Sequence, residues 1–261
     1  MPYHLRMSKQ LELFIITGAS KGMGQAMALQ LLAADHEVLT MSRSQSEALQ
    51  KTATAGQYPL LQWSLDLSDP LTASAQLRQW LAEQDASRYR SATLINNAGV
   101  IPAIAPLSQL DSTAISNAMR VGLEAPMLLT SAFLAATEHW SAVSRKVLNI
   151  SSGLGRRAIA SQACYCTAKA GVDQFSSSVA LDEALKPHGA KICSLAPGVI
   201  DTDMQVHLRS ASTESFPELA KFQQLKSQDQ LTSPEAAAAR VLAWLDRADF
   251  GEQVIADVRK P

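Results

Sequence analysis

The feature that most constrains this chain is a regular alternation of short apolar runs with longer stretches of helical periodicity. Most of the short runs are apolar on both faces, as are strands that helices cover on both sides. Such alternation predicts an α/β protein whose parallel sheet is connected by right-handed crossovers. The predicted strands are 11–17, 37–42, 60–65, 93–96, 146–151, 191–196 and 253–258, and the predicted helices are about 22–34, 45–54, 69–85, 108–138, 164–186 and 234–246.

Seven strands fit one doubly wound domain better than two domains, so we expect residues 1–261 to form a single domain. Residues 199–232 interrupt the alternation, because they form a long polar stretch between the sixth strand and the last helix. Insertions beyond the carboxyl ends of strands commonly cover a binding site, so this segment is predicted to be a substrate lid. A surface loop without a role in binding is the alternative.

Composition excludes several classes of protein. The chain is 47% hydrophobic and 18% charged, which is ordinary for a soluble globular protein. Its 23 basic and 24 acidic residues nearly cancel, so neither nucleic acid nor a membrane is an expected partner. No run approaches about 18 consecutive apolar residues, and residues 1–10 lack the apolar run of a signal peptide. These features predict a cytoplasmic location.

The stretch TGASKGMG, Thr17 to Gly24, directly follows the first predicted strand and opens the first helix. Glycines in such a turn let the backbone approach a pyrophosphate, which then lies at the helix N-terminus. A glycine-rich turn is a weak signal alone, but its place between strand and helix indicates a dinucleotide site in a Rossmann-type fold. The residues predicted to bind the cofactor here are Gly18, Ser20, Lys21, Gly22, Met23 and Gly24.

The end of the second strand predicts which dinucleotide is bound. An NAD site usually has a carboxylate there for the ribose 2′-hydroxyl, but this strand ends in TMSRS with Ser42 and Arg43. Arg43 together with Lys21 could pair with a 2′-phosphate, so the predicted cofactor is NADP(H). The alternative is that these two basic residues lie on the surface without a ligand.

Further cofactor contacts are predicted beyond the third and fourth strands. Asp66 could accept a hydrogen bond from the adenine amino group, or it could cap the helix that starts near Asp69. Asn96 and Asn97, in NNAG, could equally brace the sheet or touch the ligand. The residues predicted as contacts are Asp66, Leu67, Asn97, Ala98 and Gly99.

The stretch QACYCTAKAG places Tyr165 and Lys169 four residues apart on one helix face. An ammonium beside a phenol favours the phenolate, so Lys169 is expected to lower the pKa of Tyr165 and prepare it for acid–base work. Ser152, at the end of the fifth strand, could donate a hydrogen bond to a substrate carbonyl. The cysteines Cys164, Cys166 and Cys193 have no CxxC spacing and are predicted to be core residues, with no metal site.

Together with the glycine turn, NNAG, NISS and APG, these motifs make the chain resemble a classical short-chain dehydrogenase/reductase over about residues 11–258. The resemblance implies that Tyr165 protonates the developing alkoxide and that Ser152 orients the carbonyl. It implies that Lys169 tunes Tyr165 and that both residues contact the cofactor. The fragment APGVIDTDM is similar to the family's nicotinamide loop, which implies cofactor contacts at Pro197, Gly198, Val199 and Thr202.

Within the family, the chain resembles the sepiapterin reductases and the bacterial benzil reductases. LFIITGASKGMG, APMLLTSAF, VLNISSG, YCTAKAG, APGVIDTDMQ and DFGEQV carry this likeness. It implies an NADPH-dependent reduction of one carbonyl of a 1,2-diketone to a hydroxy ketone. A pterin side-chain reductase or another small-ketone reductase is the alternative. The candidate substrate contacts are Leu154, Met204 and Asp257.

The chain departs from the family at Gly122, in RVGLEAP, where the resemblance would place an asparagine that holds a proton-supply water. Asn117, five residues away, is a poor substitute because it falls on another helix face. Three outcomes are open: another water fills the space, the enzyme is strongly impaired, or the chain binds NADP without turnover.

A second departure lies in the last strand, where sepiapterin reductases place an acidic residue that anchors the pterin. The matching residue is Ile255, while Asp257 shares its face roughly 6–7 Å further along. This favours an apolar diketone over a pterin, and Asp257 could instead be a solvated carboxylate at the strand end.

The predicted helices 108–138 and 164–186 have apolar faces, and the resemblance implies that the family pairs these helices across a two-fold axis. A homodimer or homotetramer is therefore predicted. Core packing within one chain is the alternative explanation of these apolar faces.

Overall fold

The computed structural model describes residues 10–260. Within this range, seven strands form one parallel sheet in the order β3-β2-β1-β4-β5-β6-β7. The predicted seven-stranded parallel sheet of a Rossmann-type fold is therefore confirmed. The strands are β1 (Leu11–Thr17), β2 (Glu37–Ser42), β3 (Leu60–Ser64), β4 (Tyr89–Asn96), β5 (Ser144–Ile150), β6 (Lys191–Ala196) and β7 (Ile255–Asp257).

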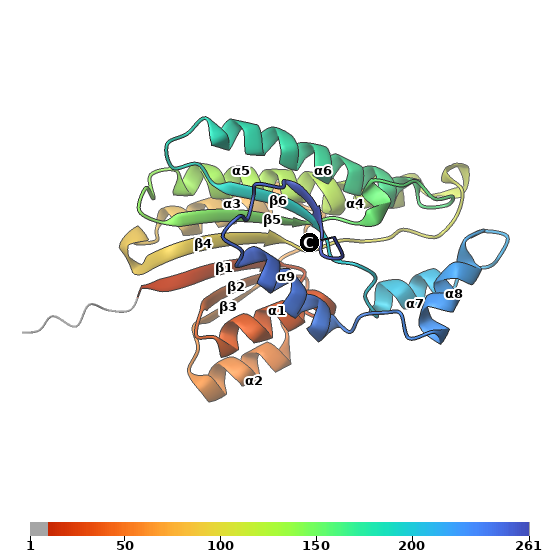
Figure 1. Cartoon of the computed structure of the whole chain (residues 1–261), viewed down its shortest axis with the longest axis horizontal. Coiled ribbons are helices and arrows are strands. Elements are labelled where there is room, and N and C mark those ends of the chain that lie inside the picture. Colours follow the sequence, from red (N-terminus) through yellow and green to blue (C-terminus); the bar gives the residue numbers. More distant parts are fainter. Residues whose placement is uncertain (1–9, 261) are drawn as a thin grey trace, which may run out of the picture.

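Helices cover both faces of this sheet (Figure 1). One face carries α1 (Gly22–Ala33), α2 (Glu47–Gly56) and α9 (Pro234–Leu245). The other carries α3 (Pro70–Ala82), α4 (Ser112–Met119), α5 (Ala125–Thr137) and α6 (Ala163–Ala184). In β1, Phe14 and Ile16 pack in the apolar cluster under α1 and α9, while Leu13 and Ile15 pack in the cluster under α3 and α5. Both faces of this strand are buried, which explains why its sequence is apolar throughout.

Helix starts follow local capping chemistry. Ser46 caps α2, Asp69 caps α3 and Asp111 caps α4, each accepting a hydrogen bond from a backbone N–H of the first turn. Asp69, rather than Asp66, therefore caps α3. Asp66 accepts a hydrogen bond from the backbone N–H of Ser68 (2.9 Å), which shapes the turn before that helix.

Several strand boundaries differ from the sequence prediction, most of all in β4. β4 begins at Tyr89, four residues before the predicted start at residue 93, because Tyr89 is buried and stacks on Trp140 with ring centroids 5.7 Å apart. Strand β7 is shorter than predicted and covers only Ile255–Asp257. The ends of these strands show little alternation of apolar and polar residues in the sequence. Their limits therefore depend on tertiary contacts, which the sequence does not reveal.

The predicted helix 108–138 consists of α4, a π-helical segment over Arg120–Glu124, and α5. By length and composition alone, the helix from Ser112 to Thr137 could cross a membrane, with a mean hydropathy of 1.2 over 18 residues. Half of that window is buried inside the protein, where Leu129 and Phe133 pack in the core. This degree of burial is typical of the core helix of an α/β fold.

Gly122 lies in the π-helical segment, buried against α6. A Cβ added there would lie 3.0 Å from the Cβ of Ala168, closer than ordinary van der Waals contact. The glycine therefore lets the segment approach α6, a packing role that the sequence did not indicate. π-helical insertions are common next to functional sites, and this one lies beside the helix that carries Tyr165 and Lys169.

We expect Gly122→Ala to be destabilising mainly through Ala168. Overpacking costs about 1–3 kcal/mol, and removal of a helix-interior glycine returns about 1 kcal/mol. In an Ala168→Gly background the overpacking disappears, so the free energy cost of Gly122→Ala should fall by about 1 kcal/mol or more. Urea unfolding of the four proteins of this cycle measures the coupling. Additive effects, within about 0.5 kcal/mol, would contradict the packing role.

Candidate active site

A cleft of about 1220 Å³ opens at the carboxyl ends of the strands, where the strand order reverses between β1 and β4. Ligands of doubly wound folds bind at this point. Every catalytic, cofactor and substrate residue predicted from the sequence lines this cleft. Its wall also contains residues that the sequence did not single out, among them Ile101, Arg156, Arg157, Arg259 and Lys260, together with His207, Leu208, Lys221 and Phe222 of the predicted lid segment 199–232.

The glycine turn between β1 and α1 is packed directly on the loop after β4. Gly18 has a φ of +68°, and a Cβ there would lie 2.9 Å from the Cα of Ala98. A Cβ on Gly24 would overlap the carbonyl oxygen of Gly18 and the side-chain amide of Asn97. Larger residues at either position would displace backbone, so glycine is needed at both.

Asn97 holds this junction together. Its side-chain amide donates to the carbonyl oxygens of Thr17 (2.9 Å) and Gly18 (3.1 Å). In return, the Thr17 hydroxyl accepts from the backbone N–H groups of Asn97 and Ala98, both at 3.0 Å. Of the two roles considered for Asn97, the structure supports bracing by the amide group, although the residue also lines the cleft.

Ser42 and Asn96 have similar structural bonds. The Ser42 hydroxyl accepts from the backbone N–H of Ala19 (2.9 Å), which fixes the turn against the end of β2. Asn96 donates to Asn149 (2.8 Å) and to Thr130 (3.1 Å), bridging β4, β5 and α5. Ser42, predicted as a cofactor contact, therefore also holds the glycine turn in position.

The start of α1 fits a dinucleotide pyrophosphate. Within residues 10–260, no side chain caps the first turn of α1 or of α6, whereas α2, α3, α4 and α9 are capped by Ser or Asp side chains. The uncapped backbone N–H groups of α1 belong to residues that line the cleft, and the helix dipole favours an anion there. Gly22, Met23 and Gly24, predicted to hold the phosphates, form this turn.

The two basic residues predicted for the 2′-phosphate have different surroundings. Arg43 is exposed at the end of β2 and makes no hydrogen bond or ion pair with any residue in 10–260. Lys21 instead forms an ion pair with Asp203, with Nζ and Oδ2 2.5 Å apart. Hydrogen bonds from Ser68 keep the pKa of Asp66 below its usual value, and the charge of nearby Arg43 adds to this effect.

The residues Ser152, Tyr165 and Lys169 meet on the cleft wall. Ser152 follows β5 and begins a short 3₁₀ turn, Gly153–Gly155, whose Leu154 N–H donates to its hydroxyl at 3.1 Å. The Nζ of Lys169 donates to the carbonyl oxygen of Ile150 (2.7 Å) and lies 5.8 Å from the ring centroid of Tyr165. This hydrogen bond ties the first turns of α6 to the end of β5.

Burial determines the charge states of this group. Burial raises the pKa of the Tyr165 phenol, and a hydrogen bond with Ser152 opposes this in part. The net pKa of Tyr165 is therefore raised, whereas Lys169 alone was expected to lower it, because burial has the larger effect. A phenol that stays protonated is the form that an acid needs. Burial also lowers the pKa of Lys169 to about 8, while the negative charge of Asp173 opposes that shift.

The three cysteines make no disulfide among residues 10–260. Cys164 and Cys193 are buried, and Cys166 packs beside Leu154 in a small apolar cluster. Burial raises the pKa of the Cys193 thiol to about 12, which leaves it protonated and unreactive at neutral pH.

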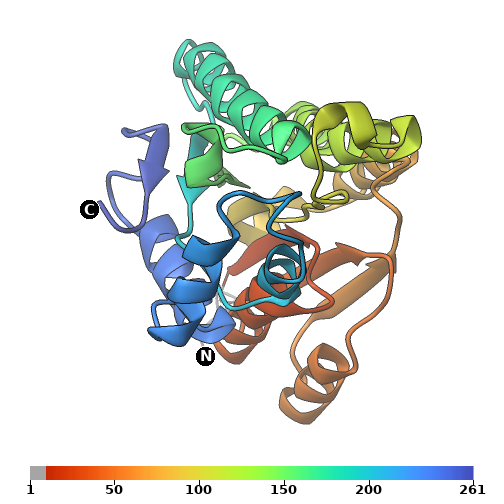
Figure 2. The ribbon, with the colours of Figure 1, turned by 90° about the vertical axis from the view of Figure 1, so that its right-hand side faces the viewer.

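Residues 199–232 form part of the cleft wall through α7 (Asp203–Arg209) and α8 (Leu219–Ser227), which lie across the carboxyl ends of the strands (Figure 2). Leu208 and Phe222 pack there in an apolar cluster with Ile104 and Ile159. Met204, a predicted substrate contact, lines the cleft from α7, and Leu154 lines it from the loop after β5. This arrangement favours a binding role for the segment over a surface loop without one.

Asp257 is not a solvated strand-end carboxylate, as one reading of the sequence proposed. Its residue exposure is only 7%, because β7 packs beside β6 and the carboxylate is covered by Arg259. Arg259 donates to Asp257 through Nε (2.8 Å), Nη2 (2.5 Å) and its backbone N–H (3.0 Å). These bonds hold the pKa of Asp257 below its usual value.

The sequence profile of the short chain dehydrogenase family matches residues 12–213. The chain belongs to this family. Its members bind a nicotinamide cofactor, and the chain is an oxidoreductase of this group.

Curated relatives confirm the predicted branch. A benzil reductase ((S)-benzoin forming) of Bacillus cereus is 36% identical over 236 residues, covering 90% of this chain and 94% of the relative. A sepiapterin reductase of Rattus norvegicus is 31% identical over 246 residues, covering 90% and 92%. The crystal structure of the KRED1-Pglu enzyme matches with a TM-score of 0.78 and 27% identity, covering 93% of this chain and 99% of that one.

The charge states predict a pH dependence of catalysis by this short-chain dehydrogenase. Lys169 loses its proton as pH rises through about 8, so kcat/KM for carbonyl reduction should fall above that pH. Asp173→Asn removes the charge that raises the pKa of Lys169, so this fall should move to lower pH. Asp182→Asn, on the exposed side of α6, is the matched control and should keep the natural profile. An unmoved profile in Asp173→Asn would count against the coupling.

Proposed function

We propose that this chain reduces one carbonyl of a 1,2-diketone to a hydroxy ketone, with NADPH as the reductant. The observation that carries the proposal is the meeting of Ser152, Tyr165 and Lys169 in one cleft with the uncapped start of α1. The substrate class rests on the similarity to benzil reductases from two Bacillus species, at 36% and 34% identity.

Each residue of the group has a task in this reaction. Ser152 donates a hydrogen bond to the carbonyl oxygen and orients it, and protonated Tyr165 delivers the proton to the same oxygen. Lys169, fixed by the Ile150 carbonyl, places a positive charge beside the phenol as it loses its proton. The bound nicotinamide supplies the hydride. A neighbouring carbonyl withdraws electrons and makes the reacting carbon a better hydride acceptor.

The substrate end of the cleft supports a diketone over a pterin. Ile101, Leu154, Leu208 and Phe222 give apolar walls that suit an aryl or alkyl group. Asp257, the acidic residue considered for a pterin, already has both carboxylate oxygens occupied by Arg259. A pterin or another small ketone remains the alternative substrate, and a binding subunit without turnover remains the alternative function because of Gly122.

The preference for NADP(H) is part of the same proposal. Arg43 supports it as a guanidinium at the end of β2 that has no hydrogen-bond or ion-pair partner in the part of the chain that the structure describes, at the place where a 2′-phosphate would lie. We further propose that the chain forms a homodimer or homotetramer in the cytoplasm. Leu181 on α6 and Leu185 directly after it support this, being 72% and 86% exposed, as does Met127 on α5.

The first test is NADPH oxidation with benzil and, in parallel, with sepiapterin. We expect turnover of benzil, and Tyr165→Phe should reduce kcat at least about 100-fold because it removes the proton donor. Binding of NADPH to this variant, measured by fluorescence titration, should change little. Tyr58→Phe, outside the cleft, is the matched control and should keep full activity. No turnover of any dicarbonyl, despite NADPH binding, would favour the binding subunit.

The second test concerns the cofactor. Arg43→Gln should weaken NADPH binding by about 10- to 100-fold, the value of a charge-assisted hydrogen bond, and should leave NADH binding nearly unchanged. Arg78→Gln removes an exposed arginine of α3 that lies outside the cleft and serves as the control. Equal losses for both cofactors would remove Arg43 from the 2′-phosphate site.

A further inference from the structure

Arg259 is held rigidly at the substrate end of the cleft. Asp257 takes three of its donors, through Nε, Nη2 and the backbone N–H. A bidentate pair of this kind fixes the plane of the guanidinium, and the buried carboxylate leaves it little freedom. The orientation of Arg259 is therefore set before any substrate arrives.

This guanidinium lies between two loops of the active site. A Cβ added to Gly153, the residue after Ser152, would lie 3.7 Å from Nη2 of Arg259. A Cβ added to Gly198, in the predicted nicotinamide loop, would lie 3.9 Å from its Cδ. Both positions are glycine, so neither of these two loop residues places a side chain against Arg259 on the side of Ser152.

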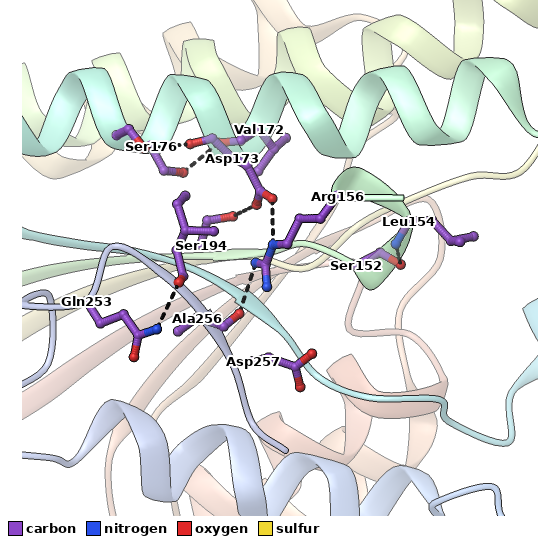
Figure 3. Close-up of polar contacts among 12 residues, drawn as sticks. Ser152, Leu154, Arg156, Val172, Asp173, Ser176, Ser194, Gln253, Ala256 and Asp257 are labelled. Carbon is purple, nitrogen blue, oxygen red and sulfur yellow. Dashed lines mark hydrogen bonds and ion pairs between the residues drawn. The ribbon is translucent and has the colours of Figure 1, made fainter. Parts of the chain in front are cut away.

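Arg156 steadies the strand that carries Asp257 (Figure 3). It forms an ion pair with Asp173 of α6 (2.9 Å) and donates to the carbonyl oxygen of Ala256 (2.9 Å), directly before Asp257. Asp173 also accepts a hydrogen bond from Ser194 of β6 at 2.6 Å. The loop after β5, α6, β6 and β7 are thus joined in one polar frame behind the Asp257–Arg259 pair.

Donor capacity remains on the cleft side of this frame. Nη1 of Arg259 has no hydrogen-bond partner among residues 10–260, and its side chain is 54% exposed in the cleft wall. Lys260 lines the cleft next to it and has no ion pair within the same residues. Asp257 balances Arg259, and Lys260 adds a further cationic group to the cleft wall.

Apolar side chains form another part of the substrate space. Ile101, Leu154, Leu208 and Phe222 all belong to the cleft wall and to the apolar cluster under α7 and α8. A substrate that complements both parts of this cleft has an apolar group on one side of the reacting ketone. On its other side it carries an anionic oxygen group within reach of Arg259.

We propose that Arg259, oriented by Asp257, binds a carboxylate adjacent to the reacting ketone, so that the substrates include 2-oxo acids with an apolar side chain. This inference rests on the proposed carbonyl reduction. A hydride adds to the keto carbon and a proton from Tyr165 to its oxygen. The 2-oxo acid becomes a 2-hydroxy acid, and the reduced nicotinamide cofactor loses two electrons. Arginine suits this role because its guanidinium keeps its proton at any working pH and, with Nε and Nη2 bonded to Asp257, still has Nη1 to donate to a substrate carboxylate.

Benzoylformate and its neutral methyl ester test the proposal, since they share the phenyl ketone and differ in charge. We expect the natural protein to reduce benzoylformate with NADPH. In Arg259→Gln, kcat/KM for the anion should fall by about tenfold or more relative to the ester, chiefly through KM. Arg259→Lys keeps the charge and should retain part of the preference.

Arg247→Gln is the matched control, because Arg247 makes the same bidentate pair with Asp249, two residues on, outside the cleft. In this variant, the ratio of kcat/KM for benzoylformate to kcat/KM for its methyl ester should equal that of the natural protein. Equal loss of anion and ester in Arg259→Gln would mean a structural role only and would overturn the inference. Turnover of benzil without any turnover of benzoylformate would overturn it too, while leaving the diketone reductase intact.

A binding measurement separates this inference from the proposed function. Calorimetric titration of the NADP⁺-loaded protein with benzoylformate needs no turnover. The natural protein should bind at least about tenfold more tightly than Arg259→Gln. Equal affinities would overturn the inference whether or not any dicarbonyl is reduced.

Discussion

The junction between the turn after β1 and the loop after β4 is the constraint on which the rest of this structure depends. The strand order reverses between these two strands, so the neighbouring loops diverge here and leave a cleft. Gly18 and Gly24 allow the two backbones to touch, and the amide of Asn97 locks them together. The start of α1, which faces the same cleft, takes its position from this contact.

The catalytic group depends on a second constraint, which is a buried ammonium. Lys169 is 6% exposed, and its burial is tolerated because the Ile150 carbonyl accepts a hydrogen bond from its Nζ and Asp173 lies one turn further along α6. Asp173 is held in turn by Arg156 and Ser194. The charge of the lysine is thus linked to four elements of the fold rather than to the tyrosine alone.

The parts of the fold that the sequence predicted are those with a local signal. Buried strands such as β1 are apolar on both faces, and the glycine turn, Ser152 and the Tyr165–Lys169 pair stand at recognisable places relative to strands and helices. Features that could not be predicted depend on partners far apart in the chain. Lys21 meets Asp203, and Arg259 lies beside Gly153; nothing near either residue indicates its partner. The raised pKa of Tyr165 also follows from burial, which spacing does not reveal.

Two backbone hydrogen bonds join the ends of segment 199–232. The Thr232 N–H donates to the Val199 carbonyl (3.0 Å), and the Asp201 N–H donates to the Thr232 carbonyl (2.9 Å). The two ends of the segment therefore leave and rejoin the body of the protein at nearly the same point. A loop with its ends already joined can change in length at small entropic cost, about 0.6 kcal/mol for each doubling. The length of residues 203–231 can therefore change while the sheet and Tyr165 keep their positions, and the shape of the substrate space changes with it.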